Sequence, residues 1–315
     1  MTSHTIGIDI SKSRLDVFDL EAGLATQFDN TISGLKSLRT WLGGRTITRI
    51  VFEPTGAYHK ALEMRLGGDY PLVKVNPLQA RRFAEAQGTK AKTDRTDARV
   101  LARMGQALDL RPQPPIPESQ RVLKELHTAR ASLMTERIRL KCRFQQQDIP
   151  LLKRQTKALL AHVDRQIAEL DVEVAALIGQ QTEGQGKMNI LTSIPGIGKL
   201  TASVILAFLP EIGGLDRKNV ASLAGVAPMT RASGQWVGKA YIKGGRRLLR
   251  HALYMPALIA TRFNPDLKAK YDQLRGAGKP AKVAIVAVMR KLVELANALV
   301  KAGRKWEPRR HAQSA

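Results

Sequence analysis

Cysteine is nearly absent from this 315-residue sequence, in which Cys142 is the single example. One thiol excludes an internal disulfide and a thiolate zinc cluster, so we expect any metal to be held by oxygen ligands, which favours Mg²⁺ with Mn²⁺ as the alternative. Long apolar runs are missing too, since none approaches the roughly 20 residues of a membrane-spanning helix. The N-terminal stretch MTSHTIGIDIS lacks a signal-peptide pattern. We therefore expect a cytoplasmic protein without a membrane partner.

Acidic residues are scarce relative to basic ones along the whole chain. There are 51 Lys and Arg against 27 Asp and Glu, which gives a formal net charge of +24. A charge of this size attracts polyanions such as DNA and RNA. Hydrophobic residues make up 43% of the sequence and aromatic residues only 5%, as in helix-rich proteins. We expect a nucleoid-associated protein of two or three domains.

The first predicted domain, residues 1–109, mixes strands and helices. Three β-rich runs near its start, TIGIDI, RLDVFDL and LATQFDN, predict an antiparallel meander. RIVFE at 49–53 and PLVKV at 71–75 predict two further strands. Three strands followed by alternating helices and strands make a mixed α/β sheet. Helical spacing of apolar residues predicts the helices at 31–41, 58–66, 77–87 and 94–108.

Four acids lie at the ends of these predicted elements. Asp9 is on the first strand, Glu53 ends the fourth, and Asp94 and Asp97 share one face at the start of the last helix. Each acid alone has an ordinary explanation, such as a turn, an exposed strand end or a favourable helix dipole. In this order, on a β-β-β-α-β-α-β-α framework, they resemble the RuvC branch of the ribonuclease-H-like fold. Four converging carboxylates can hold two Mg²⁺ ions for phosphodiester chemistry.

The second predicted segment, residues 110–180, is a linker followed by two long helices. Four prolines within 110–117 predict a stiff extended linker and a domain boundary. Two apolar series with four-three spacing then predict helices joined at Pro150. The pattern fits both an antiparallel coiled-coil hairpin and arms that pair with another subunit. Basic residues on the first helix make either a track for a nucleic-acid backbone or a solvated face.

The third predicted segment, residues 181–315, is a mainly α domain that begins with a helix-hairpin-helix. A glycine-rich stretch at 179–187 predicts a flexible joint before it. In IPGIGK, Gly196 and Gly198 separate two helical patterns, and Lys199 adds a positive charge at the second helix. Glycines there let backbone N–H groups approach a phosphate at a helix N-terminus. The pattern predicts nucleic-acid binding without specifying the chemistry.

Ser233 lies in a predicted loop rich in basic residues. Serine is a weak nucleophile unless a base removes its proton or nearby charge stabilises the developing anion. Basic side chains could gather a phosphate beside this hydroxyl, but Ser-Gly is also an ordinary turn. The predicted nucleic-acid contacts in this loop are Arg231, Lys239, Lys243 and Arg246.

Together these motifs closely resemble the insertion-sequence 110 family of transposases, including its 1111 subgroup. The likeness extends over nearly the whole chain and rests on GIDISKSRLDV, FEPTGAYHKAL, KTDRTDARVLA, IPGIGKLTA and APMTRASGQWVGKAYIKGG. It implies that Asp9, Glu53, Asp94 and Asp97 form the Mg²⁺ site of a RuvC-like domain. It also implies that Ser233, in the RASG loop, attacks the DNA phosphodiester and holds a covalent intermediate.

The resemblance implies partners as well. Members of this family act on double-stranded donor and target DNA, guided by a structured noncoding bridge RNA that pairs with both. Their homodimers assemble into tetramers in which the RuvC-like domain of one subunit meets the serine domain of another. The leading prediction is a site-specific recombinase that moves an insertion sequence. The alternatives are a junction-resolvase-like nuclease, in which water attacks and Ser233 only contacts phosphate, and a non-catalytic nucleic-acid-binding scaffold.

Overall fold

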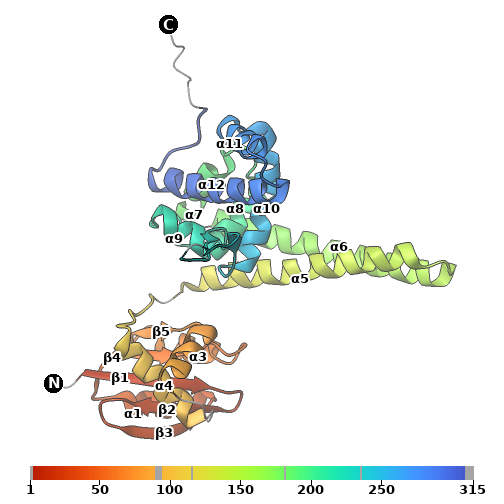
Figure 1. The fold of residues 1–315 in the computed structure, drawn as a ribbon. Coiled ribbons are helices and arrows are strands. Elements are labelled where there is room, and N and C mark those ends of the chain that lie inside the picture. The colour runs from red at the N-terminus through yellow and green to blue at the C-terminus, as the bar shows by residue number, and fades with distance from the viewer. Residues whose placement is uncertain (1–2, 89–93, 115, 181, 235, 309–315) are drawn as a thin grey trace. The chain divides into compact units, whose positions relative to one another are not determined.

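The computed structural model describes residues 3–88, 94–114, 116–180, 182–234 and 236–308, without the side chains of residues 94, 95, 182, 183, 232 and 237. The chain divides into two compact units, Met1–Ile116 and Pro117–Ala315. Each unit has its own hydrophobic core. Figure 1 shows that the first unit contains a sheet and that the second is mainly helical. The division falls within the proline-rich stretch.

A five-stranded sheet in the order β3-β2-β1-β4-β5 organises the N-terminal unit. The first three strands pair antiparallel, as predicted, while β4 is parallel to β1 and β5 is parallel to β4. Helices α1 and α2 bury one face of this sheet, and α3 and α4 bury the other. The predicted mixed α/β framework is confirmed. Its elements are β1 (Ser3–Ile10), β2 (Arg14–Asp19), β3 (Leu24–Asp29), α1 (Ile32–Leu42), β4 (Thr46–Phe52), α2 (Lys60–Leu66), β5 (Leu72–Lys74), α3 (Pro77–Ala86) and α4 (Asp94–Ala107).

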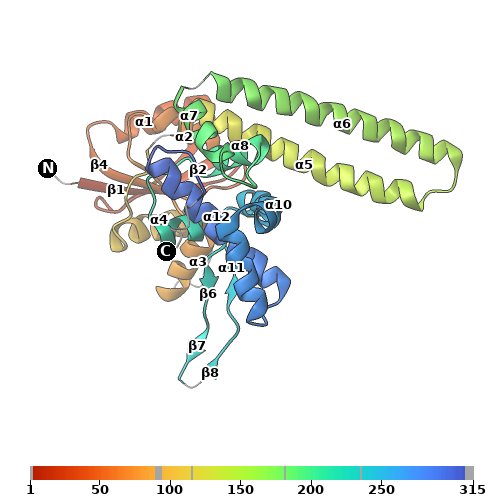
Figure 2. The same ribbon diagram turned by 90° about the horizontal axis from the view of Figure 1, so that it is seen from above.

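Two long helices, α5 (Glu118–Gln146) and α6 (Pro150–Gly179), open the second unit and pack along one another as a hairpin (Figure 2). Pro150 starts α6, where its missing N–H is not needed. Leu140, Val163 and Ile167 are buried between the two helices. An ion pair of 2.6 Å joins Arg130 of α5 to Asp171 of α6. The structure therefore shows the hairpin, which the sequence pattern had left open.

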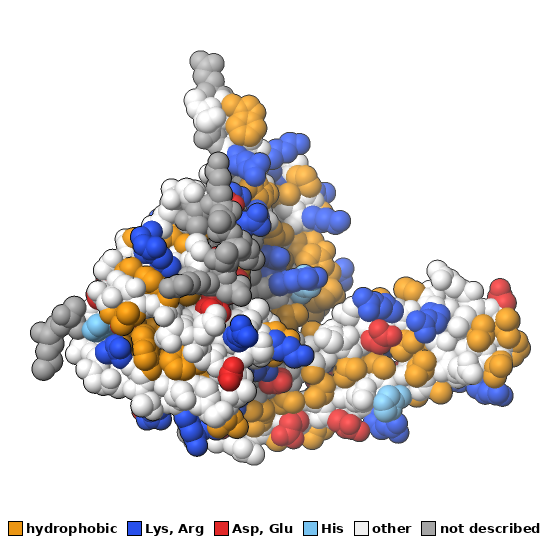
Figure 3. Space-filling view, turned by 90° about the horizontal axis from the view of Figure 1, so that it is seen from below, with side chains coloured by type: hydrophobic (Ala, Val, Ile, Leu, Met, Phe, Trp, Pro, Cys, Tyr) orange, Lys and Arg blue, Asp and Glu red, His pale blue; other side chains and the backbone are white. Residues whose placement is uncertain are grey.

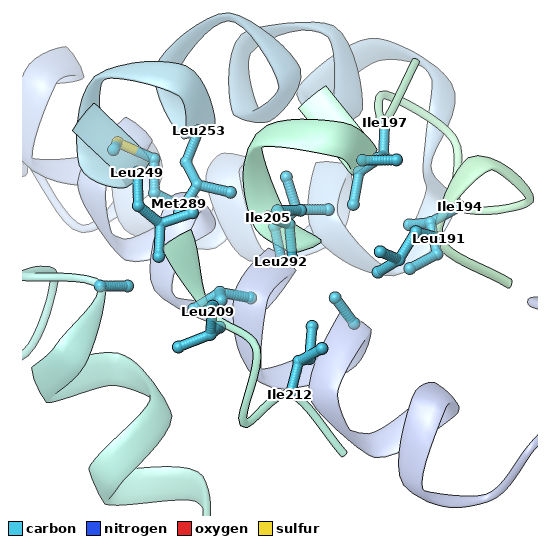
Figure 4. Packing of buried hydrophobic residues seen from close by; sticks show 14 of the residues in the cluster. Leu191, Ile194, Ile197, Ile205, Leu209, Ile212, Leu249, Leu253, Met289 and Leu292 are labelled. Carbon is cyan, nitrogen blue, oxygen red and sulfur yellow. The ribbon is translucent and has the colours of Figure 1, made fainter. Parts of the chain in front are cut away.

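The helical body of the second unit surrounds the largest core of the protein. Leu191, Ile205, Leu253 and Leu292 converge there from four different helices (Figure 4). The predicted joint at 179–187 is wrong, because α6 continues to Gly179 and the described chain is helical again from Thr182. The helices are α7 (Thr182–Thr192), α8 (Lys199–Phe208), α9 (Arg217–Leu223), α10 (Arg247–Phe263), α11 (Pro265–Gly276) and α12 (Ala281–Lys301).

A narrow β-ribbon leaves this helical body between α9 and α10 (Figure 2). The sequence predicts only a loop here, since strands of two residues have no measurable periodicity. Two antiparallel pairs form the ribbon, with β6 against β9 nearer the body and β7 against β8 at its tip. The strands are β6 (Pro228–Met229), β7 (Ala232–Ser233), β8 (Trp236–Val237) and β9 (Tyr241–Ile242).

Candidate active site and nucleic-acid interface

Asp9 and Glu53 lie at the same level on neighbouring strands. Because β1 and β4 are parallel and Ile8 pairs with Phe52, Asp9 and Glu53 occupy the next position along each chain. Ile8 and Phe52 are buried on the face covered by α1 and α2. Side chains alternate along a strand, so Asp9 projects from the opposite face and Glu53 continues the same alternation at the end of β4. Both acids are half-buried.

Helix α4 crosses that opposite face in the direction reverse to β1. A Cβ added at Gly7 would lie 2.0 Å from the carbonyl oxygen of Ala98, and one added at Gly105 would lie 3.5 Å from Thr5 Cγ2. Only glycine at position 7 therefore allows this close approach. Since Ala98 lies over Gly7 and Gly105 lies near Thr5, the start of α4 points toward the Asp9 end of β1.

Asp94 and Asp97 belong to the first turn of this helix. Asp97 directly precedes Ala98, which packs on the sheet, and Asp97 is half-buried. Asp94 begins the helix one turn before Ala98, and its side chain lies outside the described residues. The fold thus brings Asp9, Glu53 and the start of α4 to one corner of the sheet. We call Asp9, Glu53, Asp94 and Asp97 the acid corner.

A tighter group of metal-ligand atoms lies toward the other end of β1. Among the described residues, His4, Asp19 and Glu21 offer ligand atoms that all lie within 4.8 Å of one another, whereas Asp9, Glu53 and Asp97 do not form such a group of three. The buried Asp19 carboxylate accepts hydrogen bonds from His4 Nδ1 at 2.9 Å and from the Ala22 N–H at 3.2 Å, and it lies 3.4 Å from Arg45 Nε. These contacts make the group an ion-pair network that joins β1 to β2. No sequence motif marks it.

The donor set of the acid corner suits a hard divalent cation. Carboxylate oxygens are the ligands that Mg²⁺ and Mn²⁺ prefer. In two-metal sites the ions lie roughly 3.5–4 Å apart, so carboxylates shared between two ions need not meet at a single point. Asp9, Glu53 and Asp97 therefore need not form a single tight group in order to hold two ions.

The residues of the predicted helix-hairpin-helix connect α7 to α8. Gly196 has a φ of +103°, and a Cβ there would lie 2.6 Å from the carbonyl oxygen of Pro256 in α10. This glycine is thus required by packing. Gly198, by contrast, is the N-cap of α8, where a Cβ would meet nothing within 4 Å. The exposed Lys199 follows it, so the open N-terminus of α8 has a cation beside it.

Ser233 lies at the tip of the β-ribbon. It pairs across the ribbon with Trp236, and Gly234 takes a φ of +56° where the chain reverses. Ser233 is exposed, so its hydroxyl is accessible to a large substrate. The serine belongs to the second unit and the acid corner to the first.

Three of the four predicted cations of this segment are exposed: Arg231, Lys239 and Lys243. Arg231 lies over the ring of Tyr241 in β9, with its guanidinium carbon 5.0 Å from the ring centre. Such a contact holds the charge in place without neutralising it. Figure 3 shows Lys and Arg side chains interspersed with Asp and Glu along the elongated hairpin of α5 and α6.

The fourth cation, Arg246, is committed to the fold. Its guanidinium donates two hydrogen bonds of 2.7 Å to Glu211 and one of 2.8 Å to the Phe208 carbonyl oxygen. Burial raises the pKa of Glu211, but the hydrogen bonds and charge of Arg246 outweigh it and leave that pKa below its usual value. Arg246 therefore anchors the base of the ribbon to the end of α8.

Two family models match this chain. One, described as a transposase, matches residues 6–147. The other, described as the transposase IS116/IS110/IS902 family, matches residues 188–272. Together they cover well over half of the sequence. The chain belongs to the IS110 family of transposases. Its acid corner lies within the first match, and the ribbon with Ser233 lies within the second.

Individual relatives of this IS110-family chain include proteins of matching length. A pilin gene-inverting protein of Moraxella lacunata is 29% identical over 326 residues, which covers 99% of this chain and 100% of the relative. One from Moraxella bovis has the same identity and coverage. An uncharacterized protein of insertion element IS110 from Streptomyces coelicolor is 30% identical over 152 residues, 48% of this chain and 36% of the relative.

Membership of the IS110 family makes the protein an enzyme that cuts and rejoins DNA, and it indicates dependence on a divalent metal. Within the described residues, every helix is too short or too polar to cross a bilayer.

Proposed function

We propose that this IS110-family transposase is a site-specific recombinase that moves an insertion sequence through a covalent serine–DNA intermediate. Ser233 is the nucleophile. Asp9, Glu53, Asp94 and Asp97 bind Mg²⁺, or Mn²⁺ as the alternative. The observation that carries the proposal is the parallel register of β1 and β4, which sets Asp9 beside Glu53 at the end of the sheet toward which α4 begins.

The acid corner supplies the negative charge that a divalent cation requires. When bound, the metal neutralises the phosphate and stabilises the leaving oxygen. Asp9 and Glu53 are set by the strand register, and Asp97 by the packing of α4 on Gly7. These three positions are fixed by buried backbone, so they hold their geometry before DNA arrives.

Ser233 supplies the attacking oxygen. The Ser233 hydroxyl loses its proton as its Oγ forms a bond to phosphorus, and the deoxyribose oxygen that leaves gains a proton and becomes a hydroxyl. The hydroxyl of a different strand later attacks the same phosphorus and releases the serine. The number of phosphodiester bonds is conserved, so rejoining needs no external energy source. The exposed Arg231, Lys239 and Lys243 hold the phosphate backbone near this serine, and Arg246 positions the ribbon.

The proposed partners are double-stranded donor and target DNA and a structured guide RNA, and the net charge of +24 supports binding of such polyanions. Gly198 and Lys199 at the open start of α8 receive a phosphate, while Gly196 shapes the turn. We assign residues 1–109 to a RuvC-like domain, 110–180 to the linker and a coiled-coil hairpin, and 181–315 to a transposase domain with a helix-hairpin-helix. Homodimers that pair into tetramers bring the acid corner of one subunit to the ribbon of another.

A covalent-adduct assay tests the proposal. Purified protein is incubated with Mg²⁺, DNA carrying the genomic flanks of the coding region, and RNA transcribed from those flanks. A denaturant-stable protein–DNA adduct is expected with the wild type and not with Ser233→Ala, although both bind DNA. Nicking by Ser233→Ala without any adduct would instead establish the nuclease alternative. If the wild type binds DNA but neither nicks it nor forms an adduct, the protein is the non-catalytic nucleic-acid-binding scaffold.

A further inference from the structure

Trp236 is exposed in a way that the other two tryptophans are not. Its side chain lies at the tip of the ribbon with 59% of its surface accessible. Trp41 packs against Phe28 and beneath Arg45, and Trp306 packs against the helical core. An exposed indole offers a flat apolar face and a polar N–H edge, a combination that suits contact with a partner.

The indole ring of Trp236 is held over the ribbon backbone. A Cβ added at Gly238 would lie 2.5 Å from the Cη2 atom of the ring, so the ring occupies the space that a side chain at 238 would need. The Gly238 N–H donates a 2.8 Å hydrogen bond to the Arg231 carbonyl oxygen, which fixes this backbone. The ring is therefore positioned in advance.

The surroundings of the ring are basic. From Arg217 to Pro265 the sequence has no Asp or Glu. The exposed Arg231, Lys239 and Lys243 lie in the same ribbon. A partner that carries both negative charge and flat aromatic faces matches this combination, and a nucleic-acid strand with unpaired bases provides both.

Trp236 is also the direct cross-strand neighbour of Ser233. Such neighbours have Cβ atoms roughly 4.5–5.5 Å apart, a separation that a base and its own phosphate can span. We infer that Trp236 stacks on an unpaired DNA base beside the phosphodiester that Ser233 attacks. Trp236 thereby positions the DNA strand at the serine. This inference rests on the proposed role of Ser233.

Tryptophan emission tests this contact without any strand cleavage. The probes are a short single-stranded oligothymidylate and a duplex of equal charge. Saturation with the single strand should remove roughly a third of the total emission, since stacking quenches one tryptophan of three. The same titration of Trp236→Phe should show no comparable loss. Unchanged wild-type emission at saturation would overturn the inference.

Affinity provides the second readout. Trp236→Ala should weaken binding of the single strand about 10-fold, the usual effect of losing one base stack, and should affect duplex binding much less. Trp236→Phe should restore most of the affinity, because it keeps an aromatic face. Phe263→Ala removes another exposed ring, 69% accessible on α10, and should bind both probes as the wild type does. Equal losses on both probes would contradict stacking.

Two further variants separate this inference from the proposed chemistry. Gly238→Ala keeps the indole but displaces it, so the quenching should fall while the circular dichroism stays unchanged. Ser233→Ala should keep full quenching. If the wild type forms no adduct yet Trp236 is quenched, the role of Ser233 fails and the stacking contact stands. If Trp236→Ala forms adduct at the wild-type rate, Trp236 does not position the DNA strand, while the proposed role of Ser233 is unaffected.

Discussion

The acid corner and the serine ribbon are built in opposite ways. Asp9 and Glu53 of the acid corner follow the completely buried Ile8 and Phe52, and Asp94 and Asp97 lie on α4, which packs against the backbone of Gly7. The ribbon has strands of two residues, an exposed Ser233 and an exposed Trp236. The acid corner is supported by a hydrophobic core, whereas the tip of the ribbon is not.

This difference indicates how the proposed chemistry is divided. Groups that bind metal benefit from a rigid frame, because their oxygens must be held at fixed positions before the metal binds. A nucleophile that must meet a large DNA substrate benefits from exposure. We therefore expect changes under the acid corner to act through the fold, and changes on the ribbon to act through DNA alone.

The largest expected effect comes from the acid corner itself. Asp9→Asn removes one charge from the proposed metal site and should lower the recombination rate about a thousandfold or more. The control is Asp69→Asn, whose exposed ion pair with Arg39 contributes little. Product yield on a plasmid substrate, measured for variants with wild-type melting temperatures, checks this. Equal yields from Asp9→Asn and Asp69→Asn would exclude a catalytic role for Asp9.

The second largest effect is expected from the packing of α4 against β1, which holds those acids in place. Gly7→Ala places a Cβ against the Ala98 carbonyl oxygen and should destabilise the N-terminal unit by about 4 kcal/mol. Gly68→Ala, where a Cβ meets nothing within 4 Å, is the matched control and should be nearly neutral. Hydrogen exchange of the β1 amides measures the difference. Equal protection in both variants would mean that α4 does not pack this closely.

The stability of the second unit should depend on pH through His127, a buried residue of α5. Burial lowers the pKa of His127 to about 4, with the charge of Arg130 adding to the effect and that of Asp171 opposing it. The unfolded chain binds a proton near pH 6.5 and the folded chain does not, so stability falls as the pH drops from 6.5 to 4. The full loss is about 3 kcal/mol.

Urea unfolding at several pH values, followed by circular dichroism, measures this loss. His127→Phe should lack this part of the pH dependence, because Phe does not titrate and can pack beside Phe208. The difference between the two proteins isolates His127 from the carboxylates that also titrate. Parallel curves for the two proteins would contradict the assignment.

The smallest effect separates the two glycines of the α7–α8 connection. Gly196→Ala should destabilise the second unit by about 2 kcal/mol, since both the positive φ and the Pro256 carbonyl oxygen oppose a side chain. Gly198→Ala should change stability by less than about 1 kcal/mol. Melting temperatures measure both. A larger loss for Gly198→Ala would reverse the assignment of Gly196 to packing.

The sheet could be predicted from the sequence because its strands are long enough to show β-rich runs between turn residues. The sequence predicts that the four acids converge at the ends of elements of this sheet, whereas the parallel pairing of β1 with β4, which sets Asp9 beside Glu53, is seen only in the structure. The ribbon could not be predicted, since two residues per strand show no period. The joint was mispredicted because Gly184 and Gly186 indicate a break, yet α7 includes both.

Long-range partners also lie beyond what sequence patterns indicate. Arg246 has the character of a phosphate ligand, but Glu211, which no motif connects with it, neutralises its charge. His4 and Asp19 become neighbours only through the pairing of β1 with β2. Such contacts form only when the chain folds, and they produce no pattern of residue spacing that can be recognised in the sequence.

The most direct test of the central claim is to locate the bond between protein and DNA. The adduct formed in Mg²⁺ is digested with protease and nuclease, and the modified peptide is sequenced by mass spectrometry. We predict a nucleotide joined through phosphate to Ser233. A nucleotide on any other residue, or cut DNA with no modified peptide, would contradict the account.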